Sequence, residues 1–479
     1  MSQSQIVPDD IAEAAALIRS REITCRELVD GYLERIELAE PAINAFITVA
    51  ADQARESADA ADAMLRAGSS LGPLHGLPVG IKDNIETAGI RTTSGSGMLR
   101  ENVPGRDATV VDRLKRAGAI VIGKTNLHEF AWGGSTENEH FGATKNPWDI
   151  SRNSAGSSGG SGAAVAAGEC LFSLGTDTGG SIRLPAAAAG ISGLRPTVGR
   201  VSNAGVMPLA WTMDTVGPLA RTVDDVALIH GVIAGYDPAD QASSGRAVPE
   251  YVRRTRGLQG ARLGVIKDFS LAKMEPAVEA ATRTALHEAQ TAGAEIIEID
   301  LGDISQFYDA WLAIHVAEPS AVHQQRLREN PDALGADVRA LLQAGEFILA
   351  TDYIQAQRYR SHLRARFLAA FEGIDAFLTP TAAAPAAFLG ASPADFASGL
   401  VNPTGELNFF TGLPSVLGFP ALSVPCGFAH GVPLGMQIIG RPFDETGVLA
   451  IGSAYQGISD WHSNHAPLLQ TLSAAPTKD

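Results

Sequence analysis

Two short apolar runs, LPVGIKDNI around Lys82 and AIVIGKTN around Lys124, place the strongest constraint on the fold of this chain. The amphipathic segment TVVDRLKRAG lies between them. Short runs rich in Val and Ile are typical of strands buried in a sheet, whereas apolar residues at helical spacing predict a helix packed on that sheet. Because strand, helix and strand follow one another, the sequence predicts an α/β fold.

Helical patterns lie on both sides of this unit. Residues 1–65 are predicted to be helical, and Thr24 with Glu27 three positions later forms a capping box that starts one helix. Residues 276–373 are again helical and strongly charged, so we expect them to pack as an insertion or outer layer. The chain shows no internal repeat and no flexible linker, which argues against separate domains.

Composition and charge limit what the protein binds. Apolar residues make up 45% of the chain and charged residues 19%, which favours a large core and excludes a disordered chain. There are 37 Lys and Arg against 53 Asp and Glu, so the formal net charge is −16, and no basic block is present. We therefore expect no direct binding of nucleic acid or of an anionic membrane.

The cysteines and the N-terminal residues indicate a compartment. Cys25, Cys170 and Cys426 are far apart and lack CxxC or Cys/His ligand spacing, which predicts neither a disulfide framework nor a metal site. This usage fits a reducing compartment. The N-terminal residues MSQSQIVPDD do not resemble a signal or transit peptide, so we expect a cytoplasmic protein.

Two uncharged or nearly uncharged segments follow towards the C-terminus. Residues 377–400, FLTPTAAAPAAFLGASPADFASGL, are rich in Pro and Ala. This composition fits two interpretations, a surface loop or a rim or lid over a pocket. Residues 407–440 contain no Asp, Glu, Lys or Arg and exceed the ~20 residues that cross a bilayer. Repeated prolines and glycines would break a helix exposed to lipid there, so we expect buried strands and turns.

Two glycine-rich segments are the candidates for chemistry. AGSSGGSGAAVAAG, residues 155–168, runs directly into an apolar segment and is a poor linker, and it has neither a P-loop nor a dinucleotide-binding pattern. In GTDTGGSIRLP, residues 175–185, Gly179 and Gly180 allow successive N–H groups to point into one concavity beside Ser181, as an oxyanion requires. Most serines in such turns only bond local backbone groups, so a catalytic Ser181 also needs a base.

Lysine is the remaining candidate for that base. Nothing near Ser181 supplies the His and carboxylate of a serine protease triad, and no GxSxG surrounds it. Lys82 lies on a predicted buried strand, where desolvation disfavours the ammonium form and leaves a neutral amine. A pair between Lys82 and Asp83 is the alternative, but strand neighbours point to opposite faces of a sheet.

Taken together, GIKDN, GSSGGSGAAVAAG and GTDTGGSIRLPA resemble the motifs of the amidase signature family, in the expected order. The resemblance also includes KTNLHEFAWGGSTEN, GLRPTVGRVS, PALSVPCGF and PLGMQIIGRP. It implies one large α/β domain over residues 1–479, a central mixed β-sheet covered by helices. Its parts are expected to be N-terminal helices at 1–65, the catalytic core at 70–240, a more variable helical region and pocket rim at 245–400, and a return to the core sheet at 401–470.

The resemblance implies a Ser–Ser–Lys triad. Ser181 would attack the carbonyl carbon, Ser157, which follows an unusual cis peptide bond in the family, would relay the proton, and neutral Lys82 would accept it. The oxyanion would be held by the backbone N–H groups of Thr178, Gly179, Gly180 and Ser181. Supporting roles fall to Ser158, in the hydrogen-bond network, and to Asp177 and Arg183, which we expect to fix the nucleophile turn. The family requires no metal or cofactor.

Two departures from the family pattern affect the expected pocket and leave the triad untouched. Asn153, Ser154 and Ala155 replace a common Pro-Gly-Gly before GSSGG. After IRLP, the small residues AAAAG at 186–190 replace the bulkier residues often found there.

The resemblance implies a free-standing amidohydrolase acting on a small carboxamide, with an aryl or alkyl amide, an anilide or a carbamate as the expected substrate. The alternative is the A subunit of the glutamine-dependent aminoacyl-tRNA amidotransferase, which supplies ammonia to a partner protein. Arg360 fits the arginine of that protein, but Asn408 stands where an Asp is expected, so we favour the hydrolase. A catalytically inactive binding protein is disfavoured because all three triad positions are filled. A homodimer is the default oligomer.

Overall fold

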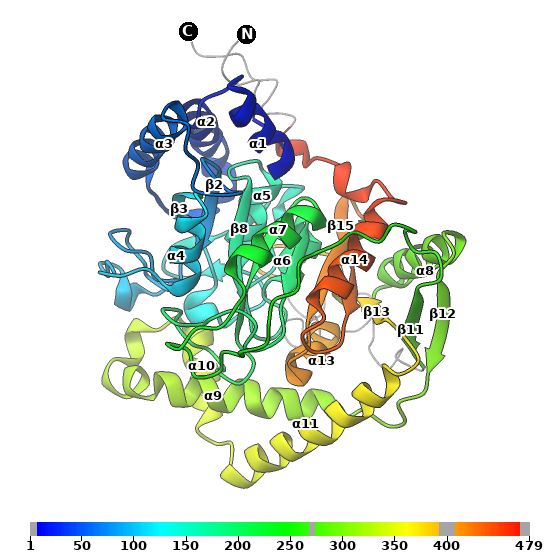
Figure 1. Cartoon of the computed structure of the whole chain (residues 1–479). Coiled ribbons are helices and arrows are strands. Elements are labelled where there is room, and N and C mark those ends of the chain that lie inside the picture. Colours follow the sequence, from blue (N-terminus) through cyan, green and yellow to red (C-terminus); the bar gives the residue numbers. More distant parts are fainter. Residues whose placement is uncertain (1–6, 268–273, 392–407, 470–479) are drawn as a thin grey trace.

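The computed structural model describes residues 7–267, 274–391 and 408–469. In these residues, eleven strands form one mixed sheet in the order β1-β3-β2-β8-β10-β9-β14-β15-β13-β11-β12. Figure 1 shows the sheet through the centre of the molecule, covered by helices. The strands are β1 (Phe46–Val49), β2 (Pro78–Lys82), β3 (Ile120–Thr125), β8 (Phe172–Asp177), β9 (Ser192–Arg195), β10 (Thr215–Ala220), β11 (Arg262–Ile266), β12 (Glu295–Ile299), β13 (Ala376–Pro380), β14 (Ala421–Ala429) and β15 (Val432–Ile439). This is the single α/β domain with a mixed sheet that the resemblance implied.

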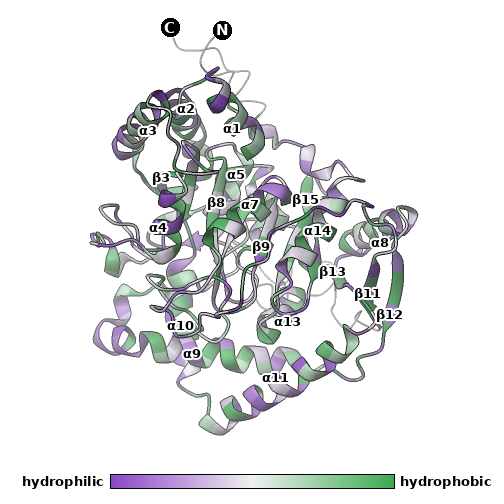
Figure 2. Cartoon of the chain, viewed as in Figure 1, coloured by the Kyte–Doolittle hydropathy of each residue, from purple (hydrophilic) through white to green (hydrophobic). Residues whose placement is uncertain are grey.

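The helices are distributed along the whole chain. Their bounds are α1 (Ile11–Ser20), α2 (Cys25–Ile43), α3 (Ala51–Arg66), α4 (Thr109–Arg116), α5 (Gly159–Ala166), α6 (Arg183–Ala189), α7 (Val223–Ile233), α8 (Pro276–Thr291), α9 (Phe307–Glu329), α10 (Ala336–Gly345), α11 (Ala350–Ala370), α13 (Phe409–Leu417) and α14 (Glu445–Gln456). Two small ribbons precede α5: β4 (Glu137–Asn138) with β5 (Gly142–Ala143), and β6 (Lys145–Asn146) with β7 (Asp149–Asn153). Figure 2 shows hydrophobic residues concentrated on the central strands, whereas α3, α9 and α11 carry many hydrophilic residues.

The strand, helix and strand unit predicted around Lys82 and Lys124 is confirmed. β2 and β3 are parallel neighbours in the sheet, and α4 lies between them in the chain. The capping box is also present, because the Thr24 side chain accepts from the Glu27 N–H while the Glu27 carboxylate accepts from the Thr24 N–H. The local patterns in this part of the sequence were therefore sufficient to predict the structure.

The region between residues 245 and 400 contains more sheet than its helical pattern indicated. Helices α8 to α11 are present, and α9, α10 and α11 lie along the lower edge of the molecule in Figure 1. Strands β11, β12 and β13 complete one end of the sheet, with β11 parallel to both of its neighbours. The first residues of the Pro- and Ala-rich segment belong to β13, and its residues 392–400 lie outside the described residues.

The segment without charged residues is buried in the fold, as expected, but it is not made only of strands and turns. It contributes β14, β15 and also the helix α13, which contains Pro414. Pro414 lacks the N–H that would bond the Phe410 carbonyl, and that carbonyl accepts instead from the Gln437 side chain at 3.1 Å. In the described part of the chain, no helix is long and apolar enough to cross a membrane.

Candidate active site

The sheet topology brings the sequence-predicted residues to one edge. β2 and β8 are parallel neighbours, so Lys82 at the end of β2 and Asp177 at the end of β8 reach the same edge. The turn after β8, residues 178–182, carries Ser181 and leads into α6. It is named the nucleophile turn for the proposed role of Ser181. Ser157 lies just before α5, which packs between β8 and α6. Three distant motifs therefore meet at the carboxyl ends of parallel strands.

Lys82 is fully buried, and its amine has only neutral partners. Its Nζ lies 2.8 Å from Ser157 Oγ, 2.7 Å from Thr176 Oγ1 and 3.5 Å from the Thr176 carbonyl. Burial lowers the pKa of Lys82 to about 7, although the charges of Asp177 and Asp214 oppose this shift. A substantial fraction of the amine is therefore neutral at pH 7 and able to accept a proton.

The alternative pair between Lys82 and Asp83 is wrong. Asp83 Oδ2 accepts from the Thr93 N–H at 2.8 Å, and its Oδ1 lies 3.6 Å from Lys124 Nζ. The reason is the alternation of side chains along a strand, which directs Asp83 away from the Ser157 side of β2. Lys124 is the lysine that faces this carboxylate.

Ser157 and Ser158 hold the two glycine-rich segments together. The Gly156–Ser157 peptide bond is cis, as the resemblance implied. The Ser157 carbonyl accepts from the His128 N–H at 3.2 Å, and the Ser158 N–H donates to the Ser181 carbonyl, also at 3.2 Å. Ser158 Oγ donates to the Thr176 carbonyl at 3.2 Å. Ser158 thus joins the nucleophile turn to the strand whose Thr176 contacts Lys82.

The nucleophile turn presents free backbone donors. The N–H groups of Thr178, Gly179 and Ser181 have no partner within the described residues. The Gly180 N–H departs from the expected set of four, because it donates to Asp177 Oδ1 at 3.0 Å. Ser181 is partly exposed, and its Oγ likewise has no hydrogen-bond partner within the described residues. The turn around Ser181 therefore leaves three backbone N–H groups unpaired within the described residues.

Both glycines in this turn are required by close packing. A Cβ on Gly179 would lie 2.8 Å from Trp311 Cζ2, and one on Gly180 would lie 2.3 Å from Thr411 Oγ1. Gly180 also has a φ of 137°, which L side chains rarely adopt. The Gly-Gly pair thus lets the backbone approach α9 and α13 closely.

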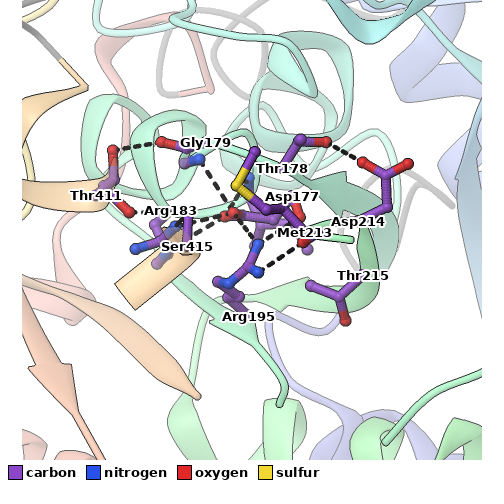
Figure 3. A network of polar contacts seen from close by, with 12 residues as sticks. Asp177, Thr178, Gly179, Arg183, Arg195, Met213, Asp214, Thr215, Thr411 and Ser415 are labelled. Atoms are coloured by element: carbon purple, nitrogen blue, oxygen red, sulfur yellow. Dashed lines mark hydrogen bonds and ion pairs between the residues drawn. The ribbon is translucent and has the colours of Figure 1, made fainter. Parts of the chain in front are cut away.

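Asp177 organises the turn through two buried arginines (Figure 3). Its carboxylate lies 2.8 Å from Arg183 and 2.9 Å from Arg195, and it also accepts from the Ile182 N–H at 3.1 Å. Burial alone would raise the pKa of Asp177, but Arg183 and Arg195 outweigh burial and hold the pKa below its usual range. The carboxylate therefore stays ionised and fixes the backbone on either side of Ser181.

Several supporting residues were missed by sequence reasoning. Asp214 accepts from Thr178 Oγ1 and from the Leu209 N–H, which anchors the start of the nucleophile turn (Figure 3). Arg195 lies on the buried strand β9, and a charged residue in such a strand was the signal that could have found it. Asp214 had no comparable signal, because it follows an irregular loop.

A cavity lined by Leu184 includes several of the residues that depart from the family pattern. Asn153, Ala155, Ala187 and Ala188 all line it. Leu184, Val278 and residues 384–387 complete much of the wall, and all of its lining residues are uncharged. The start of the Pro- and Ala-rich segment therefore forms part of a pocket rim.

Two residues considered for the amidotransferase alternative occupy neighbouring elements. Arg360 on α11 donates to the Thr212 carbonyl at 2.9 Å and to Thr212 Oγ1 at 3.0 Å. Asn408 directly precedes α13, and its Oδ1 is buried without a partner in the described part of the chain. Among the described residues, no group of three or more His, Cys, Asp and Glu side chains could hold a metal ion.

Comparisons with known proteins agree on one family for most of the chain. The family model described as Amidase matches residues 27–449. The A subunit of glutamyl-tRNA(Gln) amidotransferase from Roseiflexus sp. (strain RS-1) is 43% identical over 477 residues, covering 95% of this chain and 97% of the relative. Both chains thus match over almost their full lengths.

Two solved structures show the same fold. One is described as an unexpected vestigial protein complex that reveals the evolutionary origins of an s-triazine catabolic enzyme; it has a TM-score of 0.89 and 33% identity, covering 96% of this chain and 99% of that one. The other is a bacterial aryl acylamidase of the amidase signature family, with a TM-score of 0.88 and 28% identity, covering 98% and 99%.

Proposed function

Since this chain belongs to the amidase signature family, we propose that it cleaves the C–N bond of a carboxamide through an acyl-enzyme on Ser181. One observation carries the proposal. The buried Lys82 amine lies 2.8 Å from Ser157 Oγ, at the edge of the sheet where the nucleophile turn presents three unpaired N–H groups. A base, a relay and an oxyanion site are the groups that amide cleavage by serine needs.

The proposed reaction has two halves that use the same residues. Ser181 Oγ attacks the carbonyl carbon, and its proton passes through Ser157 to neutral Lys82. The oxyanion accepts hydrogen bonds from the N–H groups of Thr178, Gly179 and Ser181. The C–N bond then breaks, and the leaving nitrogen takes the proton back from Lys82 through Ser157. Water attacks the resulting ester by the same relay and releases the acid.

Asp177 and Arg183 act in this proposal by positioning. Their buried ion pair sets the turn that carries Ser181, and the Gly180 N–H is bound to Asp177. Ser158 acts in the same way through the Ser181 carbonyl and Thr176. These residues keep the reacting groups aligned without exchanging protons with the substrate.

The second candidate function is that of a component of an amidotransferase, in which the same amide cleavage serves a partner protein. The name of the amidotransferase relative supports a component that releases ammonia from glutamine for a partner protein. This support is stronger than the support for the free-standing amidohydrolase that the sequence favoured. The uncharged cavity beside Leu184 supports the free-standing form, which acts on an uncharged amide or carbamate.

Ammonia release by the purified chain separates the two forms. The chain alone is assayed with simple aryl and alkyl carboxamides and with glutamine, and then again with the other components of a bacterial amidotransferase added. Turnover of simple amides by the chain alone supports the free-standing form. Glutamine turnover that requires the added components supports the second candidate. If ammonia appears under neither condition, the proposed amide cleavage is wrong.

The proposed relay role of Ser157 is testable by comparison with a nearby serine. Replacing Ser157 by alanine removes the Oγ that lies 2.8 Å from Lys82 Nζ, so kcat is expected to fall about 10²- to 10⁴-fold. Ser154→Ala is the matched control, since Ser154 is also buried and its Oγ donates to the Ala155 carbonyl, at 3.4 Å, and not to the Lys82 amine. Equal rates for both variants in one assay would assign Ser157 a purely structural role.

A further inference from the structure

Two aromatic residues of α9 pack directly on the nucleophile turn. Trp311 and His315 are four positions apart and so lie on the same face of the helix. A Cβ on Gly179 would meet Trp311 Cζ2 at 2.8 Å, Trp311 Cε2 at 3.5 Å and His315 Cε1 at 3.6 Å. The three heavy atoms nearest to a Cβ at Gly179 therefore all belong to these two rings.

The two rings form one stacked unit. Their centroids are 4.6 Å apart and their planes are inclined by 17°. Trp132 meets the His315 ring edge-on at 6.1 Å, and Gly412 of α13 lies against the indole. The pair is thereby held in a fixed orientation from both sides.

Each ring also carries a buried nitrogen without a partner. Trp311 is 2% exposed and His315 is 9% exposed, and neither Trp311 Nε1 nor His315 Nδ1 has a hydrogen bond within the described residues. Buried polar groups in folded proteins are normally paired, so each unpaired nitrogen is available to a ligand. Burial lowers the pKa of His315 to about 4, so this ring is neutral at pH 7.

The ring atoms nearest to Gly179 include the carbons bonded to these nitrogens. Trp311 Cε2 is bonded to Nε1 and His315 Cε1 is bonded to Nδ1, and these carbon atoms are among those nearest to Gly179. The indole N–H can only donate a hydrogen bond, while neutral imidazole can donate or accept. Neither group supplies a charge that would pair with the ammonium or carboxylate of an amino acid.

We propose that Trp311 and His315 form a recognition subsite for a planar, uncharged acyl group with a hydrogen-bonding atom in its plane, as in a heteroaromatic carboxamide. The subsite rests on the proposed amide cleavage and names its substrate class. Packing holds the two rings in a fixed orientation, and their unpaired nitrogens select for a polar atom in the plane of the substrate ring.

Binding and turnover of three similar amides test the subsite. The probes are pyridine-3-carboxamide, benzamide and cyclohexanecarboxamide. Affinities are measured by calorimetry with Ser181→Ala, and kcat/KM is measured with the wild-type chain. We expect pyridine-3-carboxamide to be preferred over benzamide by about tenfold, which corresponds to one hydrogen bond, and benzamide over the cyclohexane compound.

Variants that keep the rings but remove the nitrogens make the test specific. At least one of Trp311→Phe and His315→Phe is expected to remove the tenfold preference for the pyridine amide over benzamide, through KM. Trp461→Phe is the matched control, because Trp461 Nε1 is also buried and unpartnered in the described residues but lies on a distant turn (Trp461–Ser463). Thermal unfolding identifies any variant that fails to fold.

The outcomes for the subsite and for amide cleavage are distinguishable. Equal affinities of Ser181→Ala for the three amides, or a preference unchanged in both phenylalanine variants, would overturn the subsite even if the wild-type chain hydrolyses amides. The expected binding preference without any turnover would support the subsite and count against the proposed reaction. Glutamine bound more tightly than all three amides would also overturn the subsite.

Discussion

Replacing Ser181 by alanine is expected to lower amide turnover by at least about 10⁴-fold while leaving the fold intact. The loss is large because the other two hydroxyls at the turn are engaged: Thr411 Oγ1 donates to the Gly179 carbonyl and Thr178 Oγ1 donates to Asp214. The fold is preserved because Ser181 is linked to the network through its carbonyl, which accepts from the Ser158 N–H, and alanine keeps that carbonyl. The partly exposed side chain itself has no partner to lose within the described residues.

Covalent labelling gives the measurement for Ser181. A phosphonate reagent that reacts with activated serine is added to the wild-type chain, and the modified peptide is identified by mass spectrometry. We expect the label on Ser181 alone, and no label on the alanine variant. The free energy of unfolding should differ by less than about 0.5 kcal/mol between the two proteins. Undiminished turnover by Ser181→Ala would show that a different residue is the nucleophile.

Lys82→Arg is expected to be nearly as inactive as Lys82→Met, with a loss of about 10⁴-fold in kcat. Arginine keeps a positive charge at this position but cannot accept a proton. The substitution therefore distinguishes a role of Lys82 as a base from a role as a fixed positive charge. The neutral amine depends on burial, which lowers the pKa of Lys82 to about 7. Substantial activity in the arginine variant would mean that the charge alone matters, and the proton relay would be wrong.

The same residue predicts a pH dependence. Activity should fall as pH decreases below about 7, because the amine becomes protonated there. Below that pH, Lys82 is protonated in both the folded and the unfolded chain, and the folded state bears the full cost of burying an ammonium group. Between about 7 and the ordinary value of 10.5, the unfolded chain binds more protons, so this residue's contribution to the free energy of unfolding rises with pH.

Lys124 provides a control for the effects of burial. It is fully buried on the neighbouring strand, and burial lowers its pKa to about 8, but its Nζ bonds the Ile85 carbonyl and Thr92 Oγ1 and lies near Asp83. Lys124→Met should destabilise the protein because Asp83 loses its cation. The acidic limb of the kcat profile should stay in place, whereas a shift of that limb would contradict its assignment to Lys82.

Local patterns predicted much of the fold. The apolar runs at β2 and β3, the helix α4 and the capping box at Thr24 depend on residues that are close in sequence, so the sequence could predict them. Strands β11 and β12 were not predicted because they are short and stand among strongly helical segments. The helix α13 was also missed, since Pro414 is tolerated only where Gln437, from a different strand, binds the freed carbonyl.

By itself, the sequence determined that the protein has an α/β fold and that Lys82, Ser157 and Ser181 are the residues to examine. The tertiary structure decided which groups these three residues and their neighbours contact. In the folded chain, Lys82 Nζ contacts Ser157 Oγ, and Asp83 lies near Lys124 instead of Lys82. The Gly180 N–H donates to Asp177. Trp311 and His315 pack against Gly179. Each of these contacts joins residues from different elements or depends on side-chain direction. Their partners are set by strand order and helix packing, which no local pattern of residues encodes.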